Sequence, residues 1–195
     1  MDKKDLKLVK NLSIWGAVFV IVVGTLLHFC YDWSGNNFIV GIFAPVNESP
    51  WEHMKLAFTP IILFGFVDYY FLKINPKRPK GVERIFPLCF AFVKEIGVSI
   101  FFILAVFYTY TYFTGDSILA IDISSFIIGI ILAKWFGYLI LTGRFKNWEF
   151  KGLNTLSALL LVIITSFFII ATLDPPRINL FKDPIDGSYG IGKMK

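Results

Sequence analysis

Five long apolar stretches constrain this chain more than any other feature of its sequence. They cover residues 12–31, 51–72, 85–113, 118–141 and 153–173. A helix that crosses a bilayer needs roughly 20 mostly apolar residues, and each stretch meets that length. The composition agrees, because 56% of the residues are hydrophobic and only 17% are charged. We therefore predict an all-α integral membrane bundle of about five transmembrane helices, built as a single transmembrane domain over residues 1–195 with an outer tail at 174–195.

Basic residues occur on alternate connections between these stretches. The segments "KKDLKLVK", "KINPKRPKGVER" and "GRFKNWEFKG" are rich in Lys and Arg, whereas "YDWSGNNFIVGIFAPVNES" and "TGDS" contain neither. Cytoplasmic loops carry this excess of positive charge, so we predict a cytoplasmic N-terminus and an outside C-terminus. The net charge of +5 then indicates contact with anionic lipid rather than with nucleic acid. The sequence is compatible with assembly as a homo-oligomer and with binding to a membrane partner protein.

The start of the second stretch carries a helix-start pattern, "SPWE". Ser49 is a preferred N-cap residue, and Pro50 suits the first helical position because its missing N–H would have no partner there. Glu52 stands where a capping box would close on the N-cap backbone. Pro60 follows inside the same helix and is expected to bend it by removing one backbone hydrogen bond.

Polar residues gather at the predicted outer ends of three helices. His28 and Asp32 are four residues apart and share one helix face. Convergence with the next helix start would give a site for zinc, iron or manganese, with His28, Asp32, Glu52 and His53 as ligands. A polar pocket for a proton, an ion or a small ligand is an alternative, and ordinary interfacial polarity is another. The candidate binding residues are Glu48, Glu52, His53, His28, Asp32, Lys94, Glu95 and Asp122.

The segment "FIVGIFAPV" at residues 38–46 is too short to span a bilayer and too apolar for a free loop. We predict a short interfacial or re-entrant segment before the second span, which is permitted where the backbone faces protein or water. It would either cover a pocket or pack against its neighbours for stability alone.

Charges inside the third stretch also indicate a function. Lys94 and Glu95 lie roughly 15 Å along that helix, where each charge would cost about 2.5–3.5 kcal/mol. An internal ion pair with neighbouring helices is one interpretation, and a proton or ion relay or an intramembrane acid/base site is the other. Asp68 and Lys134 are expected to form an interfacial salt bridge near the cytoplasmic helix ends.

The phrase "APVNESPWEH" and the tail "DPP…LFKDPIDGSYGIG" together resemble a family of small polytopic bacterial membrane proteins with no assigned function. The resemblance rests on the Asn-Glu-Ser-x-Trp-Glu-His motif and on the tail rich in Pro, Asp and Gly. It implies a multi-pass protein of the bacterial cytoplasmic membrane. It implies no substrate, cofactor or residue role.

Three classes of function remain open from the sequence. The favoured class is binding or transport of a small solute or ion through the outer polar residues, because buried ionisable residues outnumber any recognisable catalytic geometry. A metal-dependent, hydrolase-like intramembrane enzyme is the second class, and an accessory or scaffold subunit of a membrane complex is the third. The sequence is compatible with an enzyme and with a protein that has no catalytic activity.

Overall fold

The computed structural model describes residues 2–77, 79, 88–144 and 152–191. The predicted all-α bundle is confirmed, and five of its helical segments are long and apolar enough to cross a membrane. The elements are α1 (Lys3–Trp33), α2 (Phe38–Phe43), α3 (Pro50–His53), α4 (Lys55–Tyr69), the π-helical turn η1 (Tyr70–Ile74), α6 (Leu88–Thr114), α7 (Leu119–Leu141), α8 (Leu153–Leu173) and the 3₁₀ turn η3 (Asn179–Phe181).

Helix boundaries differ from the predicted stretches mainly at the N-terminus. Helix α1 begins at Lys3 because Asp2 caps it, its side chain accepting a hydrogen bond from Asp5 N at 2.7 Å. The basic N-terminal segment is therefore helical and continuous with the first span. The second span is composite, since α3, α4 and η1 follow one another from Pro50 to Ile74. Residues 85–87 of the third predicted stretch lie outside the described residues.

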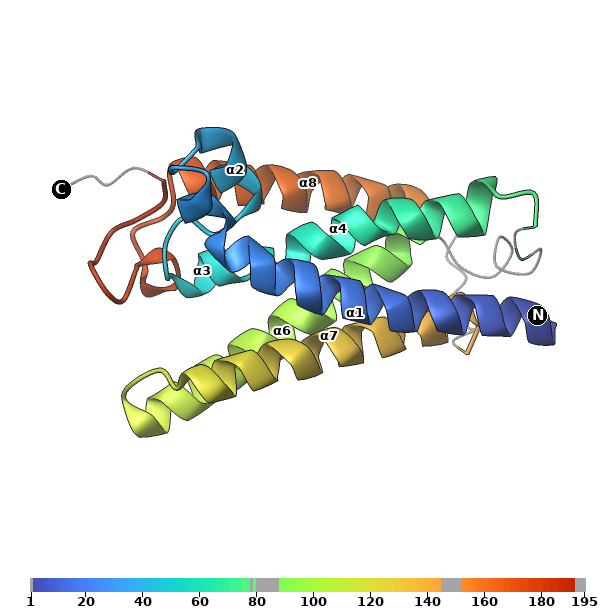
Figure 1. Ribbon diagram of the computed structural model, residues 1–195, viewed down its shortest axis with the longest axis horizontal. Helices are drawn as coiled ribbons and strands as arrows, with labels where there is room; N and C mark the ends of the chain where they lie inside the picture. Colours follow the sequence, from blue (N-terminus) through green and yellow to red (C-terminus); the bar gives the residue numbers. More distant parts are fainter. Residues whose placement is uncertain (1, 78, 80–87, 145–151, 192–195) are drawn as a thin grey trace.

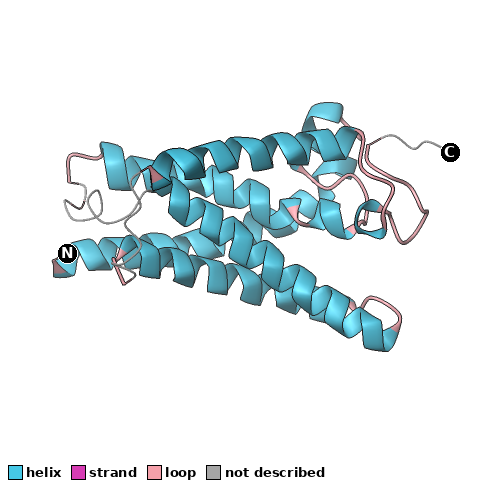
Figure 2. Cartoon of the chain, turned by 180° about the vertical axis from the view of Figure 1, so that it is seen from behind, coloured by secondary structure: helices cyan, strands magenta, loops and turns pink. Residues whose placement is uncertain are grey.

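The long helices pack side by side, with the two chain ends at opposite ends of the bundle (Figure 1). Helices α6 and α7 form an antiparallel hairpin with extensive mutual contact, and α1 packs on both α4 and α7. The tip of the α6–α7 hairpin diverges from the other helices, as the view from behind also shows (Figure 2). We call the end that holds α2, α3 and the C-terminal tail the outer end.

Helices α1 and α4 approach each other closely at a point where a glycine of α1 lies against a backbone carbonyl of α4. Pro60 has no N–H, so it cannot donate to Leu56 O, the acceptor four residues earlier. Gly24 of α1 lies against that same carbonyl, and a Cβ at position 24 would collide with it. The small residue thus lets two backbones meet, as is common between membrane helices.

Two apolar clusters make up the interior. The one toward the outer end comprises Val20, Trp51, Met54, Ala57, Phe58, Ile61, Ile96, Ile130, Phe168, Ala171 and Phe181. The one toward the inner end comprises Val9, Leu72, Leu88, Phe90, Ala91, Phe92, Ile140 and Leu141. Large apolar side chains also cover the outward faces of the helices, for example Phe66 and Phe101. Apolar faces of this kind are suited to contact with a lipid bilayer.

The segment after α1 forms a short helix, α2, capped by Asn37, whose side chain accepts from Ile39 N at 2.9 Å. Phe38 and Phe43 are exposed, whereas Gly41 is buried against α1 and the C-terminal tail. This arrangement fits the predicted interfacial segment, because one face is apolar and open while the other packs on protein.

Candidate functional site

The chain around Ser49 adopts part of the predicted helix start. The Ser49 hydroxyl accepts from Glu52 N at 3.3 Å, and Pro50 occupies the first turn, as expected of an N-cap. The reciprocal half of the capping box is not formed. Ser49 N donates instead to Asn47 Oδ1 at 3.0 Å, because the Glu52 side chain turns inward to other partners. Glu48 and His53 are thereby left on the outer side of the turn.

Three side chains meet at this point, and we call them the outer cluster: His28, Glu48 and His53. Among the described residues, these form the group whose potential metal-ligating atoms all lie within 4.8 Å of one another. Glu48 Oε2 is 3.3 Å from His53 Nε2 and 4.0 Å from His28 Nε2. The two imidazole rings lie edge to face, with their centroids 5.2 Å apart. All three side chains are partly exposed, so the cluster is accessible from outside the protein.

The backbone orients one ring of the cluster. His53 Nδ1 lies 3.0 Å from Ser49 O, and a carbonyl oxygen can only accept, so Nδ1 carries a proton. The other ring nitrogen, Nε2, therefore faces Glu48. Both ring nitrogens of His53 thus point at acceptors. Either a second proton or a metal cation at Nε2 satisfies this arrangement.

Glu48 is held in place through both its side chain and its backbone. The hydrogen bond from His53 lowers the pKa of the Glu48 carboxyl from its usual value, although partial burial acts in the opposite direction. Its backbone N–H donates to Asp183 Oδ2 at 3.0 Å. Asp183 comes from the C-terminal tail and is itself buried. Its other oxygen accepts from Ile185 N at 2.7 Å, so one side chain ties two loops together.

The C-terminal tail crosses the outer end as a strap (Figure 1). The Phe181 ring packs against Trp51, with centroids 4.8 Å apart. Ile191 N donates to Thr172 O at 2.8 Å, which returns the tail to the end of α8. The tail therefore lies across the outer end of the bundle.

A polar pocket of about 470 Å³ lies between the strap and the end of α1. His28 and Glu48 line it, so it adjoins two members of the outer cluster. Its other charged lining residues among those described are acidic: Asp32, Asp183 and Asp186. Such a pocket favours a cation over an anion.

Glu52, a predicted metal ligand, is placed elsewhere. It forms a fully buried ion pair with Lys55, with Oε2 2.6 Å from Nζ. Both members have further partners: Lys55 donates to Gly41 O at 2.8 Å, and Glu52 accepts from Val46 N at 3.1 Å. The pair is thus locked beneath α2 and does not point toward the outer cluster.

A second group of buried charges lies in the inner half of the bundle, and we call it the inner triad: Asp68, Glu95 and Lys134. Lys134 Nζ is 2.7 Å from Glu95 Oε2 and 3.8 Å from Asp68 Oδ2. The interpretation of Glu95 as a member of an internal ion pair is confirmed. Asp68 and Lys134 pair as predicted, but they are buried with Glu95 rather than extended to the interface.

The remaining candidates have separate surroundings. Lys94 does not accompany Glu95 into the inner triad, because neighbouring residues on a helix point about 100° apart. Its side chain is partly buried, and its ammonium lies 5.5 Å from the Phe90 ring centroid. Asp122 accepts from the Tyr110 hydroxyl at 2.6 Å at the tip of the α6–α7 hairpin. Asp32 lines the polar pocket without joining the outer cluster.

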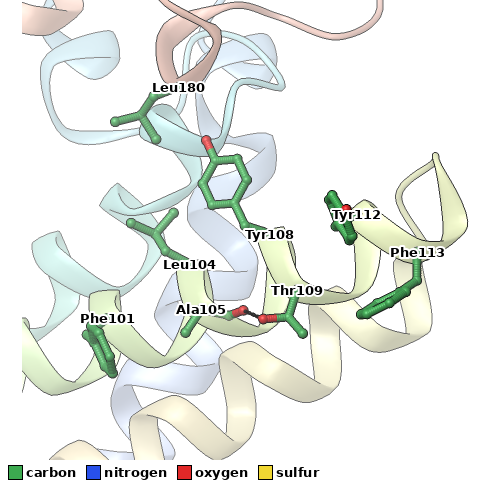
Figure 3. Close-up of a pocket in the computed structure, with 8 residues that line it drawn as sticks. All are labelled: Phe101, Leu104, Ala105, Tyr108, Thr109, Tyr112, Phe113 and Leu180. Carbon is green, nitrogen blue, oxygen red and sulfur yellow. Dashed lines mark hydrogen bonds between the residues drawn. The ribbon is translucent and has the colours of Figure 1, made fainter.

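A larger cavity of about 620 Å³ lies on the outer half of α6 (Figure 3). Figure 3 shows apolar and aromatic side chains along one face of the helix, with Leu180 of the strap above them. Its lining is formed by Phe101, Leu104, Ala105, Tyr108, Thr109, Tyr112, Phe113 and Leu180. It contains no titratable group other than tyrosine among the described residues, so it offers no ligand set.

Residues 1–191 match the model of a family of unknown function, DUF6512. The chain belongs to this family. The expectation of an uncharacterised family is thereby confirmed for DUF6512, while a bacterial source stays a prediction. No curated protein and no solved structure matches the chain.

Two residues at the outer end of this DUF6512 protein are absent from the sequence-based candidates. One is Lys55, whose position three residues after Glu52 in the predicted second span is a local signal for an ion pair. Asp183 gave no such signal, because it contacts Glu48 across 135 residues of chain. Only the fold of the strap brings it there.

Proposed function

We propose that this protein binds a divalent transition-metal cation at the outer cluster and receives it through the adjoining acidic pocket. The observation that supports this most is the meeting of His28, Glu48 and His53 at one point. Two imidazoles and a carboxylate suit zinc, iron or manganese. The ligand set differs from the one expected from the sequence, because Glu48 takes the place of Glu52 and Asp32 is not part of the cluster.

The separations within the cluster fit one shared ion. Ligands at about 2.1 Å from zinc in tetrahedral geometry lie about 3.4 Å apart. The two distances from Glu48 to the histidines, 3.3 and 4.0 Å, are close to that value. The contact of His53 Nδ1 with Ser49 O is the kind of outer-shell bond that fixes the orientation of a metal-binding imidazole.

Metal binding to purified protein tests the proposal. We expect protein prepared in mild detergent without chelators to bind one Zn²⁺ per chain, measured by elemental analysis and titration calorimetry. Glu48→Gln and His53→Ala should each weaken Zn²⁺ binding by more than about 100-fold, since even loss of an outer-shell partner costs 10–100-fold. Binding should also weaken at acid pH, because the metal and a proton compete for His53 Nε2.

Asp32→Asn is the matched control. Asp32 lines the same pocket but lies outside the outer cluster, so its replacement should change Zn²⁺ affinity far less than Glu48→Gln. Equal losses in all three variants would mean a diffuse acidic surface rather than a defined site. Folded protein that binds no Zn²⁺, Fe²⁺ or Mn²⁺ would refute the proposal.

A metal-dependent enzyme is a second candidate, and the three-residue ligand set favours it. Catalytic zinc sites keep three protein ligands and leave one position for water or substrate. Retention of the metal through exhaustive dialysis would favour this candidate. Metal-ion flux into vesicles containing the protein, lost in Glu48→Gln, would favour transport instead.

A further inference from the structure

The inner triad has an unbalanced charge. Two carboxylates, Asp68 and Glu95, face one ammonium group, Lys134. All three side chains are almost completely buried, and each comes from a different helix: α4, α6 and α7. If all three were ionised, one negative charge would remain uncompensated inside a membrane bundle. That state is costly, so another positive charge must accompany the triad.

The outer buried pair shows what balanced charges look like in the same protein. Glu52 and Lys55 match one to one and have further hydrogen bonds to backbone groups. By contrast, Asp68 Oδ2 lies 3.8 Å from Lys134 Nζ, beyond hydrogen-bond distance. Glu95 holds the lysine more closely, at 2.7 Å. Asp68 is therefore the less well compensated carboxylate.

The surroundings keep the lysine charged and, among the residues that the structure describes, no other cation acts on the triad. Lys134 Nζ lies 5.1 Å from the Phe64 ring centroid, which favours the ammonium form through a cation–π contact. Helix α1 contributes Gly16 at this point, and a Cβ there would press on the lysine stem. Within the described residues, the charged groups that act on the triad are its own members.

We propose that the inner triad is a proton-binding site, in which one exchangeable proton is held by the carboxylates of Asp68 and Glu95, mainly by Asp68. The proton supplies the positive charge that the geometry requires. The site lies about two helical turns in from the start of α6 at Leu88. It is distinct from the outer cluster and does not depend on metal binding there.

Infrared spectroscopy of the protein in lipid vesicles tests this inference. At neutral pH the wild type should show the carbonyl stretch of a protonated carboxylic acid, and the band should shift in D₂O. Asp68→Asn and Glu95→Gln should each abolish the band, because a single remaining carboxylate is neutralised by Lys134 and needs no proton. Asp116→Asn, at an exposed position between α6 and α7, is the control and should leave the band unchanged.

The wild-type spectrum is decisive even where a variant fails to fold. Absence of an exchangeable carboxylic acid band at neutral pH would overturn the proposal. A band that persists at full intensity in either folded variant would also overturn it, since the proton would then belong to a different carboxyl group. Loss of the band in the two triad variants but not in Asp116→Asn supports it.

Discussion

At the scale of single residues, one pair of buried charges is fully satisfied. Lys55 and Glu52 form a closed pair in which the ammonium also reaches Gly41 O and Ala44 O. This pair fastens α2 to the start of the second span and leaves no polar group of either side chain unused. Breaking such a pair on one side is more harmful than replacing both sides, because the lone survivor stays buried and charged.

Lys55→Met should therefore destabilise the protein by about 3–5 kcal/mol, since it leaves Glu52 buried without its cation. The double variant Lys55→Met with Glu52→Gln should regain most of that loss, because the amide can still accept from Val46 N and can donate to the freed carbonyls. Thermal unfolding in detergent measures both. A double variant as unstable as the single one would contradict this account.

Glu48 should give the outer end a pH dependence. Its pKa is lowered in the folded protein by the hydrogen bond from His53, so its ionised form is favoured by folding. That contribution to stability is fully present above the unfolded-state pKa of about 4.3 and is lost as the pH falls through the lower folded-state value. The difference in melting temperature between wild type and Glu48→Gln should shrink over this acid range. A difference that is constant with pH would argue against the mechanism.

At the scale of elements, the helices are held in register by small residues beside charged ones. Gly137 of α7 faces the Glu95 carboxyl, and a Cβ at 137 would collide with Oε1. The length and apolar character of α6 and α7 could be predicted from the sequence. The rotation that turns Glu95 toward Lys134 could not be predicted. Apolar residues occur on all sides of both helices, so the sequence pattern does not identify the face that is buried.

Gly137→Ala should destabilise the bundle by about 1–3 kcal/mol, because the added methyl group overpacks the contact between α6 and α7. Gly97→Ala is the matched control on α6. A Cβ at 97 meets no atom within 4 Å, so alanine should be neutral or stabilise the helix by roughly 0.5–1 kcal/mol. Unfolding of the two variants in the same detergent compares them. Equal effects would show that Gly137 is not a tight contact.

At the scale of the whole molecule, five spans leave the two chain ends at opposite ends of the bundle. The number of spans could be predicted from the sequence, because a helix that crosses a bilayer must be long and apolar and such helices are easily recognised. The meeting of His28 with His53 was also anticipated from the shared outer end. The choice of Glu48 over Glu52 depended on which way a short turn directs its side chains, which no spacing rule provides.

The predicted orientation can be read by chemical labelling of intact cells. In a background with Cys30→Ser and Cys89→Ser, Asp116→Cys should react with a membrane-impermeant maleimide from outside. Lys77→Cys should react only after the membrane is permeabilised. Both positions are exposed at opposite ends of the helices. The reverse pattern of labelling would invert the proposed topology.

The inner triad also has a consequence for how the chain enters the membrane. Asp68 and Glu95 are synthesised before Lys134. The helices that carry these two carboxylates, α4 and α6, are therefore made before α7 provides the lysine that pairs with them. A chain truncated after Thr114 should be degraded faster in a pulse-chase experiment than the full-length protein, and equal lifetimes would contradict this view. We therefore expect the lifetime of the nascent protein to depend on one lysine of the fourth span.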